Sequence, residues 1–168
     1  LHRHGMALPN QGDIDQQSIT GATATGTHGT GASLQNLSSR VVGARIALAS
    51  GEIVECSPTQ NAELWQASRL HLGAFGLVVA LQLQCVESYR LQEQIQKLPL
   101  IEALNDLDTL VANNRHCEFF WYPQSDTANL KTINPTDTPA EYPLAGEGER
   151  CGWSYEVLPN HRPHLHTE

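Results

Sequence analysis

The sequence predicts an α+β fold in which antiparallel strands dominate. Two runs rich in apolar and β-branched residues, 41–49 and 53–56, flank Ser50-Gly51, a spacing typical of a β-hairpin. Residues 99–113 place Leu, Ala and Val at helical spacing on one face, with acidic residues opposite. The aromatic run 117–122 and the run 128–133 lie on either side of a Pro-Gln-Ser-Asp turn and predict a second strand pair. Hairpins combined with separate helices are typical of the α+β class.

The segment before the hairpin predicts little regular structure. Residues 1–18 carry no clear periodicity, and Pro9 and Gly12 interrupt them. Asp13 and Asp15 predict a cap or turn in front of a loop, in preference to a pair of catalytic acids. Residues 32–39 predict a short helical turn or an irregular connection.

After the hairpin, the sequence predicts a short helix and then a strand. Asn61 is expected to cap a helix over 62–70, which the Gly-Ala-Phe-Gly turn at 73–76 ends. Residues 77–86 are apolar at first and alternate later, so they predict a strand that enters the core from a buried end.

The pattern changes around residues 87–89, where we place a domain boundary. Beyond it, residues 91–96 predict a strand that precedes the helix of 99–113. Residues 134–152 are rich in Pro, Gly and acids, which predicts a long surface loop or partial disorder. A last strand is expected over 154–158.

Composition narrows the function classes. The chain has 168 residues, 40% of them hydrophobic, and a formal net charge of −8, which excludes a nucleic-acid surface built from clustered Lys and Arg. No apolar run is long enough to cross a bilayer, and the Leu-His-Arg-His start is not that of a signal peptide. The cysteines form no C-x-x-C pair, so we predict no zinc site and reduced thiols in a cytoplasmic protein; they are Cys56, Cys85, Cys117 and Cys151.

Residues 19–31, I-T-G-A-T-A-T-G-T-H-G-T-G, are dense in glycine and carry no acidic, Lys or Arg side chain. Such density marks backbone that takes positive φ or approaches another group closely. Small residues with hydroxyls and amide N–H groups between the glycines are typical of a loop that binds phosphate. A P-loop is excluded because Ala32 stands where lysine is required, and the Rossmann pattern fails at Leu34. On these residues alone, a glycine-rich turn that binds no ligand remains an alternative interpretation.

Motifs on both sides of this stretch resemble a known family. In chain order they are A-L-P-N-Q-G-D-I-D-Q-Q (7–17), N-L-S-S-R-V-V-G (36–43), G-E-I-V-E-C-S (51–57), L-H-L-G-A-F-G-L-V (70–78), L-Q-C-V (83–86), F-F-W-Y-P-Q-S-D (119–126) and S-Y-E-V-L-P (154–159). Each motif is weakly specific, but their order and spacing together resemble the FAD-linked sugar-1,4-lactone oxidases and dehydrogenases. These include the L-gulonolactone, D-arabinonolactone and L-galactonolactone enzymes of the vanillyl-alcohol-oxidase type, which share a PCMH-type FAD-binding domain.

The resemblance implies a domain organisation. Residues 1–88 would be the C-terminal half of the FAD-binding domain, a mainly antiparallel sheet with helices. Residues 89–168 would begin an α+β substrate domain. We therefore expect the chain to be an internal fragment that is inactive alone.

The resemblance also implies which residues bind the cofactor. The glycine-rich loop would contact FAD and its pyrophosphate, and Val78 would lie by the adenine through its backbone. The expected cofactor-binding residues are Gly21, Ala22, Gly26, Thr27, His28, Gly29, Thr30, Gly31, Ala32, Ser33 and Val78. Catalytic residues stay unknown, because the Glu, Arg and H-W-x-K elements of the family lie in its C-terminal part.

The implied reaction is a two-electron oxidation of a sugar 1,4-lactone or a polyol by FAD, with oxygen or another electron acceptor. Three alternatives stay open: an alditol oxidase of the same fold, a reductase with the same flavin fold, and a non-catalytic remnant. The F-F-W-Y-P-Q-S-D match argues against the reductase.

Two histidine features suggest other chemistry. His28 has no acid or nucleophile beside it in the motif, so no catalytic triad is indicated. His161, His164 and His166 suggest a metal cluster, but Pro163 interrupts the run and no regular element fixes their spacing. We predict no metal site.

Overall fold

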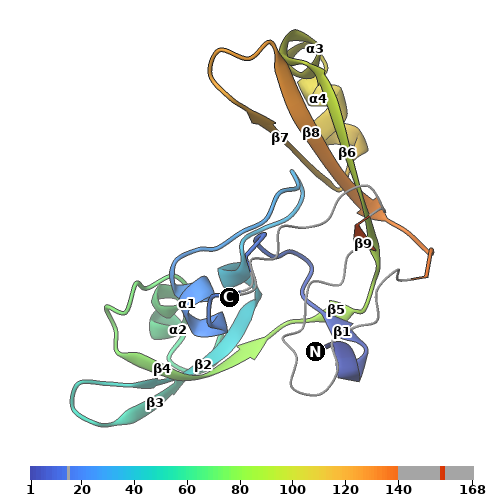
Figure 1. Ribbon diagram of the computed structural model, residues 1–168. Helices are drawn as coiled ribbons and strands as arrows, with labels where there is room; N and C mark the ends of the chain where they lie inside the picture. The colour runs from blue at the N-terminus through green and yellow to red at the C-terminus, as the bar shows by residue number, and fades with distance from the viewer. Residues whose placement is uncertain (15, 140–155, 158–168) are drawn as a thin grey trace. The chain divides into compact units, whose positions relative to one another are not determined.

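The computed structural model describes residues 1–14, 16–139 and 156–157 (Figure 1). Within these residues the helical elements are η1 (His2–His4), α1 (Ile19–Ala24), η2 (Leu37–Arg40), α2 (Ala62–Ser68), α3 (Leu100–Asn105) and α4 (Leu107–Asn113). The strands are β1 (Met6–Ala7), β2 (Val41–Ala47), β3 (Ile53–Cys56), β4 (Leu77–Leu83), β5 (Val86–Glu87), β6 (Leu91–Pro99), β7 (His116–Trp121), β8 (Thr127–Pro135) and β9 (Glu156–Val157). The predicted α+β class is confirmed.

The chain divides into two compact units. The N-terminal unit comprises residues 8–29 and 34–86, and the C-terminal unit comprises residues 1–7, 30–33 and the chain from Glu87 onward. The assignment of two domains with a boundary at 87–89 stays a prediction, and each unit is described by itself.

A three-stranded antiparallel sheet with the order β3-β2-β4 forms the centre of the N-terminal unit. The predicted hairpin is confirmed, because β2 and β3 pair from Ala44–Cys56 to Ala47–Ile53. Its turn uses Gly51, whose φ of 87° lies in the left-handed region that favours glycine. The sheet buries a small core, against which Leu64 and Trp65 of α2 and Val78 of β4 pack; its members are Ala44, Ile46 and Cys56.

The helix α2 begins where the sequence predicts it, but the Asn61 side chain does not cap it. Asn61 occupies the N-cap with φ of 49°, and its side chain donates to the Glu55 carbonyl at 2.8 Å instead of capping the helix. The helix ends at Ser68, before the predicted stop at 73–76, and the chain then turns through Leu72 and Gly73 with positive φ. The indole of Trp65 donates to the Val41 carbonyl at 3.2 Å, which ties α2 to β2.

The prediction that β4 starts from a buried end is wrong for the described residues. Leu77 is 70% exposed and Val79 is 46% exposed. β4 is an edge strand of this sheet and pairs with β2 alone, so a neighbouring strand shields its first residues on one side only. It also ends at Leu83, and the predicted continuation forms the separate strand β5, which pairs with β1.

The glycine-rich stretch begins as a helix, which corrects the expectation of a loop throughout residues 19–31. Ser18 is the N-cap of α1, and its hydroxyl oxygen accepts a hydrogen bond from the Gly21 amide at 3.1 Å. Ala22 packs with Leu8 and Leu37 in a second small core of the N-terminal unit. The expected cap from the Asp-Ile-Asp motif is therefore replaced by Ser18, and Asp15 lies outside the described residues.

Replacing Ser18 with alanine is expected to destabilise α1 by about 1 kcal/mol, because the Gly21 amide loses its acceptor. Urea unfolding of the complete polypeptide that contains this chain measures the effect. Ser18→Asp is the matched control, since a carboxylate oxygen accepts the same bond and should keep the wild-type midpoint. Equal midpoints for the alanine and aspartate variants would contradict the capping role.

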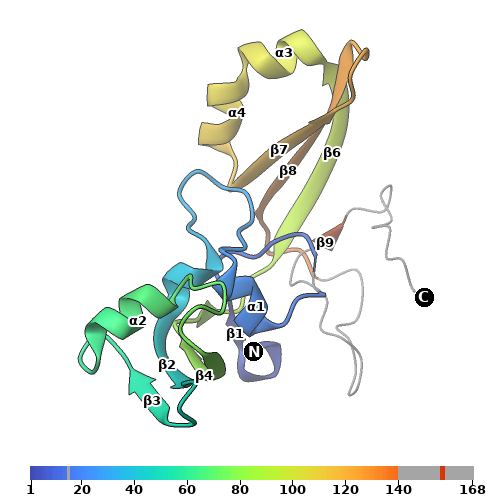
Figure 2. The same cartoon turned by 90° about the vertical axis from the view of Figure 1, so that its left-hand side faces the viewer.

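The C-terminal unit is built on a sheet with the order β7-β8-β6-β9. β8 pairs antiparallel with β7 and β6, as the sequence predicts for the first pair, and β9 pairs parallel with β6. Figure 2 shows α3 and α4 on one side of this sheet. Ala103 of α3 is fully buried, and Ala128 and Leu130 of β8 are 1% exposed.

The helix predicted over residues 99–113 is two helices that meet at Asp106. The Asp106 amide donates to the Glu102 carbonyl at 3.0 Å, and its own carbonyl accepts from the Leu110 amide at 2.8 Å. Asp106 thus ends α3 and begins α4 with φ of −97° and ψ of 6°. Asn105 and Asp106 favour non-helical backbone through local hydrogen bonding, which explains a break that apolar periodicity does not reveal.

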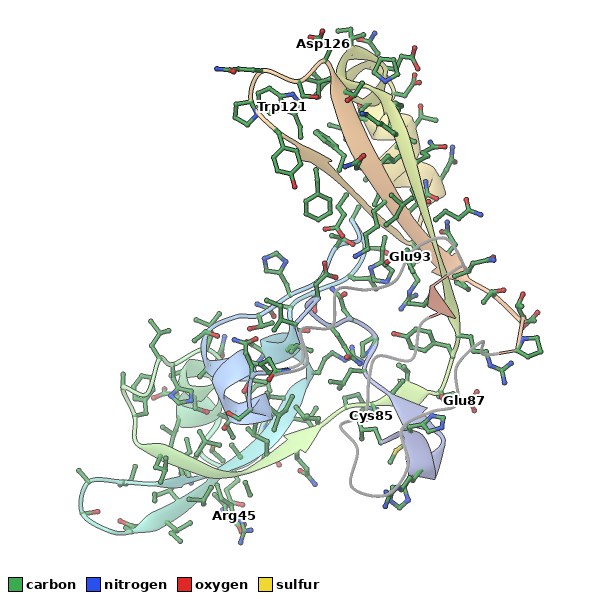
Figure 3. All side chains as sticks on the ribbon, viewed as in Figure 1. Arg45, Cys85, Glu87, Glu93, Trp121 and Asp126 are labelled. Carbon is green, nitrogen blue, oxygen red and sulfur yellow. The ribbon has the colours of Figure 1, made fainter. Side chains whose placement is uncertain are left out.

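The turn between β7 and β8 presents aromatic side chains to solvent. Trp121 is 44% exposed and Tyr122 is 70% exposed, so these two side chains lie outside the core of the unit. Figure 3 shows Trp121 and Asp126 near the two ends of this turn. The Trp121 indole donates to the Ser125 carbonyl at 2.7 Å, which braces the turn.

Candidate cofactor-binding loop

After α1, residues 25–36 form an irregular loop that contains most of the predicted cofactor-binding residues. Gly26 and Gly31 take φ of 72° and 107°, conformations that L side chains rarely adopt. The Leu37 amide donates to the Thr27 carbonyl at 2.9 Å, which brings the two ends of the loop together. The positive φ that the glycine density predicts is therefore present at these two positions.

The backbone amides of the predicted residues fall into two groups. Those of Gly21, Ala22, Gly26 and Thr27 donate within the chain, to Ser18, Thr23 or Ala22. Those of residues 28–33 donate to no other group among the described residues. Residues 28–33 are exposed or half-buried, so these amides are open to water or to an acceptor such as phosphate oxygen. The assignment of Gly21 and Ala22 to the cofactor site stays a prediction that would need atoms other than their amides.

Gly29 is the most tightly enclosed position of the loop. A Cβ added there would overlap the Gln11 carbonyl oxygen and the side chain of Asn10. Asn10 is 3% exposed, and its amide donates to the Gln35 carbonyl at 3.2 Å. The loop backbone at Gly29 therefore lies directly against the segment before α1.

The electrostatic character of the loop also suits an anion. No Asp or Glu occurs between residues 16 and 39, although the chain carries a net charge of −8. Among the side chains, the Thr27 hydroxyl donates to Gln17 at 3.0 Å, and the exposed His28 places Nδ1 2.9 Å from the Gly29 carbonyl. An acid-free loop with successive amide donors fits the pyrophosphate of FAD.

Val78 lies on β4, where it pairs with Ile46 and packs against the core of the N-terminal sheet. The Val78 side chain therefore has a packing role in the sheet. Its backbone contact with adenine stays a prediction.

The structure adds one residue that sequence reasoning missed. His116, the first residue of β7, places Nδ1 3.0 Å from the carbonyl oxygen of Thr30 and 3.3 Å from its hydroxyl. A separation of 86 residues and the absence of a motif around His116 left no signal in the sequence.

Beside His116, Cys117 has a perturbed thiol. Burial raises the pKa of Cys117 above its ordinary value, and the neighbouring Glu118 carboxylate raises it further.

Neutralising Glu118 is thus expected to lower the thiol pKa and to speed iodoacetamide labelling of Cys117 at a fixed pH near 8, because thiolate is the reactive form. Peptide mass spectrometry of a Glu118→Gln variant measures the rate. Glu102→Gln, an exposed change on α3, should leave labelling unchanged; equal rates in both variants would refute the electrostatic contribution.

Metal ligands do not gather in the described part of the chain. No group of three or more His, Cys, Asp or Glu side chains lies there in a metal-binding arrangement. Cys151 and the histidine run at 161–166 lie outside the described residues. No helix in the described residues is long and apolar enough to span a membrane.

Family models and relatives match both parts of the chain. A model described as FAD binding domain matches residues 1–57, and one described as D-arabinono-1,4-lactone oxidase matches residues 81–162. L-gulono-1,4-lactone dehydrogenase of Mycobacterium tuberculosis is 41% identical over 157 residues, covering 90% of this chain and 36% of the relative. L-gulonolactone oxidase of Bos taurus is 36% identical over 139 residues, covering 83% of this chain and 32% of the relative.

A third relative and a solved structure extend the comparison. The mitochondrial L-galactono-1,4-lactone dehydrogenase of Brassica oleracea is 32% identical over 135 residues, covering 80% of this chain and 22% of the relative. Cholesterol oxidase from Brevibacterium sterolicum shares the fold, with a TM-score of 0.71 and 17% identity over 87% of this chain and 31% of that chain. The chain spans about a third of the first two relatives. These matches confirm the resemblance to the FAD-linked sugar-1,4-lactone oxidases.

Proposed function

We propose that this chain, related to the FAD-linked sugar-1,4-lactone oxidases and dehydrogenases, forms the FAD-contacting part of such an enzyme and the start of its substrate domain. The observation that carries the proposal is the run of uncommitted amides at residues 28–33, in a loop without acidic side chains. The match of residues 1–57 to a FAD binding domain supports it. In this proposal residues 1–88 belong to the flavin domain and residues 89–168 begin the substrate domain.

The loop would act by binding and orientation. Amide N–H groups of residues 28–33 would donate to the pyrophosphate oxygens, and the hydroxyl of Ser33 would add a further donor. Positive φ at Gly31 lets consecutive peptides turn in a way that a larger residue would resist. When bound, FAD would supply the two-electron oxidation of a carbon that bears a hydroxyl, and oxygen or another acceptor would then take up the electrons.

The substrate class follows from the relatives. Their names specify L-gulono-, D-arabinono- and L-galactono-1,4-lactones, and the identities of 31–41% support a sugar 1,4-lactone here. A cytoplasmic location is part of the proposal, supported by the wide spacing of the cysteines.

Anaerobic reduction of the complete polypeptide tests this function. The purified protein should be yellow, and a sugar 1,4-lactone should bleach the flavin absorbance. Bleaching by open-chain polyols and not by lactones would move the assignment to an alditol oxidase. A colourless protein that takes up no added FAD would refute the proposal.

A further inference from the structure

A buried histidine in the C-terminal unit hydrogen-bonds the loop. The His116 side chain is 8% exposed, and its Nδ1 lies 3.0 Å from the Thr30 carbonyl oxygen. A carbonyl oxygen accepts only, so Nδ1 carries the proton and donates it. The Thr30 hydroxyl lies 3.3 Å from the same nitrogen. One imidazole therefore contacts both the backbone and the side chain of Thr30.

The strand β7 fixes the position of this imidazole. His116 pairs with Ile133 of β8 in the antiparallel ladder. Immediately before it, the Arg115 amide donates to the Asn134 side chain at 2.9 Å, and Asn134 in turn donates to the Asn114 side chain at 2.7 Å. Side chains on a regular strand with locked neighbours hold their geometry better than side chains on a loop.

The loop, by contrast, has few restraints of its own. Within the described residues, the two contacts of His116 with Thr30 are the hydrogen bonds that tie residues 28–33 to a helix or strand. His28 contacts the adjacent Gly29 carbonyl and adds no long-range restraint. Without His116, the Thr30 peptide would be free to rotate about its flexible neighbour Gly31.

We propose that His116 is a positioning residue for the cofactor: its Nδ1–H holds the Thr30 peptide and thereby preorganises the amides of residues 30–33 for the FAD pyrophosphate. The inference rests on the proposed function, because it takes FAD as the ligand of the loop. A loop that is ordered before binding loses less conformational entropy when it binds, so removing the anchor weakens affinity.

The test compares two replacements of His116 in the complete polypeptide. His116→Leu removes the donor, whereas His116→Asn places an amide N–H close to the position of Nδ1. His116→Leu is expected to raise the dissociation constant of FAD about tenfold, measured by flavin fluorescence on titrating the apoprotein. His116→Asn should remain within about threefold of wild type. Phe119→Leu, on the same strand and without a contact to Thr30, is the packing control.

A second readout needs no cofactor. NMR relaxation of the backbone amides in the apoprotein should give lower order parameters at residues 30–33 in His116→Leu than in wild type, and values close to wild type in His116→Asn. Equal weakening of FAD binding by both variants, or unchanged order parameters in His116→Leu, would overturn the proposal. Should His116→Leu fail to fold by circular dichroism, His116→Gln replaces it, because its longer side chain displaces the donor. If the wild-type protein takes up no FAD, the proposed function fails while the relaxation comparison still tests the anchor.

Discussion

Alanine at position 29 is expected to weaken FAD binding by the complete enzyme about 10- to 100-fold. The added methyl group would overlap the Gln11 carbonyl oxygen and the Asn10 side chain. Neither obstacle can move cheaply, since one is backbone and the other is buried and hydrogen-bonded to Gln35. The loop must therefore shift, and the amides of residues 28–33 shift with it. Fluorescence titration of the apoprotein with FAD measures the loss.

Gly51→Ala is the matched control for this prediction. Gly51 also has positive φ, at 87°, but a Cβ there meets nothing within 4 Å. The change should cost about 1–2 kcal/mol of stability through backbone strain and leave FAD affinity intact. A Gly29→Ala protein with wild-type affinity would show that the loop is not the FAD site, or that it tolerates displacement.

Replacing Lys131 with methionine is expected to destabilise the C-terminal unit by about 3–5 kcal/mol, because it leaves two carboxylates together without their cation. Lys131 Nζ lies 3.4 Å from Glu93 and 3.0 Å from Glu118. The side chains of Lys131 and Glu93 are 11% and 6% exposed, and that of Glu118 is 24% exposed. Figure 3 shows Glu93 on β6, which pairs with β8. Because these side chains are mostly buried, water screens the charges of the cluster poorly.

Urea unfolding followed by circular dichroism measures the effect of Lys131→Met. Lys97→Met, at an exposed position of β6, is the control and should change stability by less than about 0.5 kcal/mol. Combining Lys131→Met with Glu118→Gln should recover part of the loss, since one uncompensated charge is removed. A Lys131→Met protein as stable as the Lys97→Met protein would contradict the buried-pair account.

The strands were more predictable from sequence than the loop and its neighbours. Residues 53–56 form a strand where alternation and the Ser50-Gly51 turn predict one, because a two-residue period is a local signal. The helix α1 was missed because glycine and threonine are weak helix formers. The Ser18 cap and the packing of Ala22 in the core outweigh that preference.

The candidate site was predictable in composition and less so in detail. Glycine density identified the backbone around Gly26 and Gly31, where φ is positive. The end of α1 decides which backbone amides already donate hydrogen bonds within the chain, and sequence patterns place helix boundaries poorly. His116 joins the loop through tertiary structure alone, so no local pattern could reveal it.

The placement of the tryptophans gives each compact unit its own optical reporter. Trp65 lies against the core of the N-terminal sheet, and Trp121 lies half-exposed at the end of β7 in the C-terminal unit. In variants of these 168 residues with Trp153 replaced by phenylalanine, keeping one of these two indoles would confine the tryptophan emission to a single unit. A shared fluorescence midpoint in urea would indicate one cooperative structure, and two midpoints would indicate that the units unfold independently.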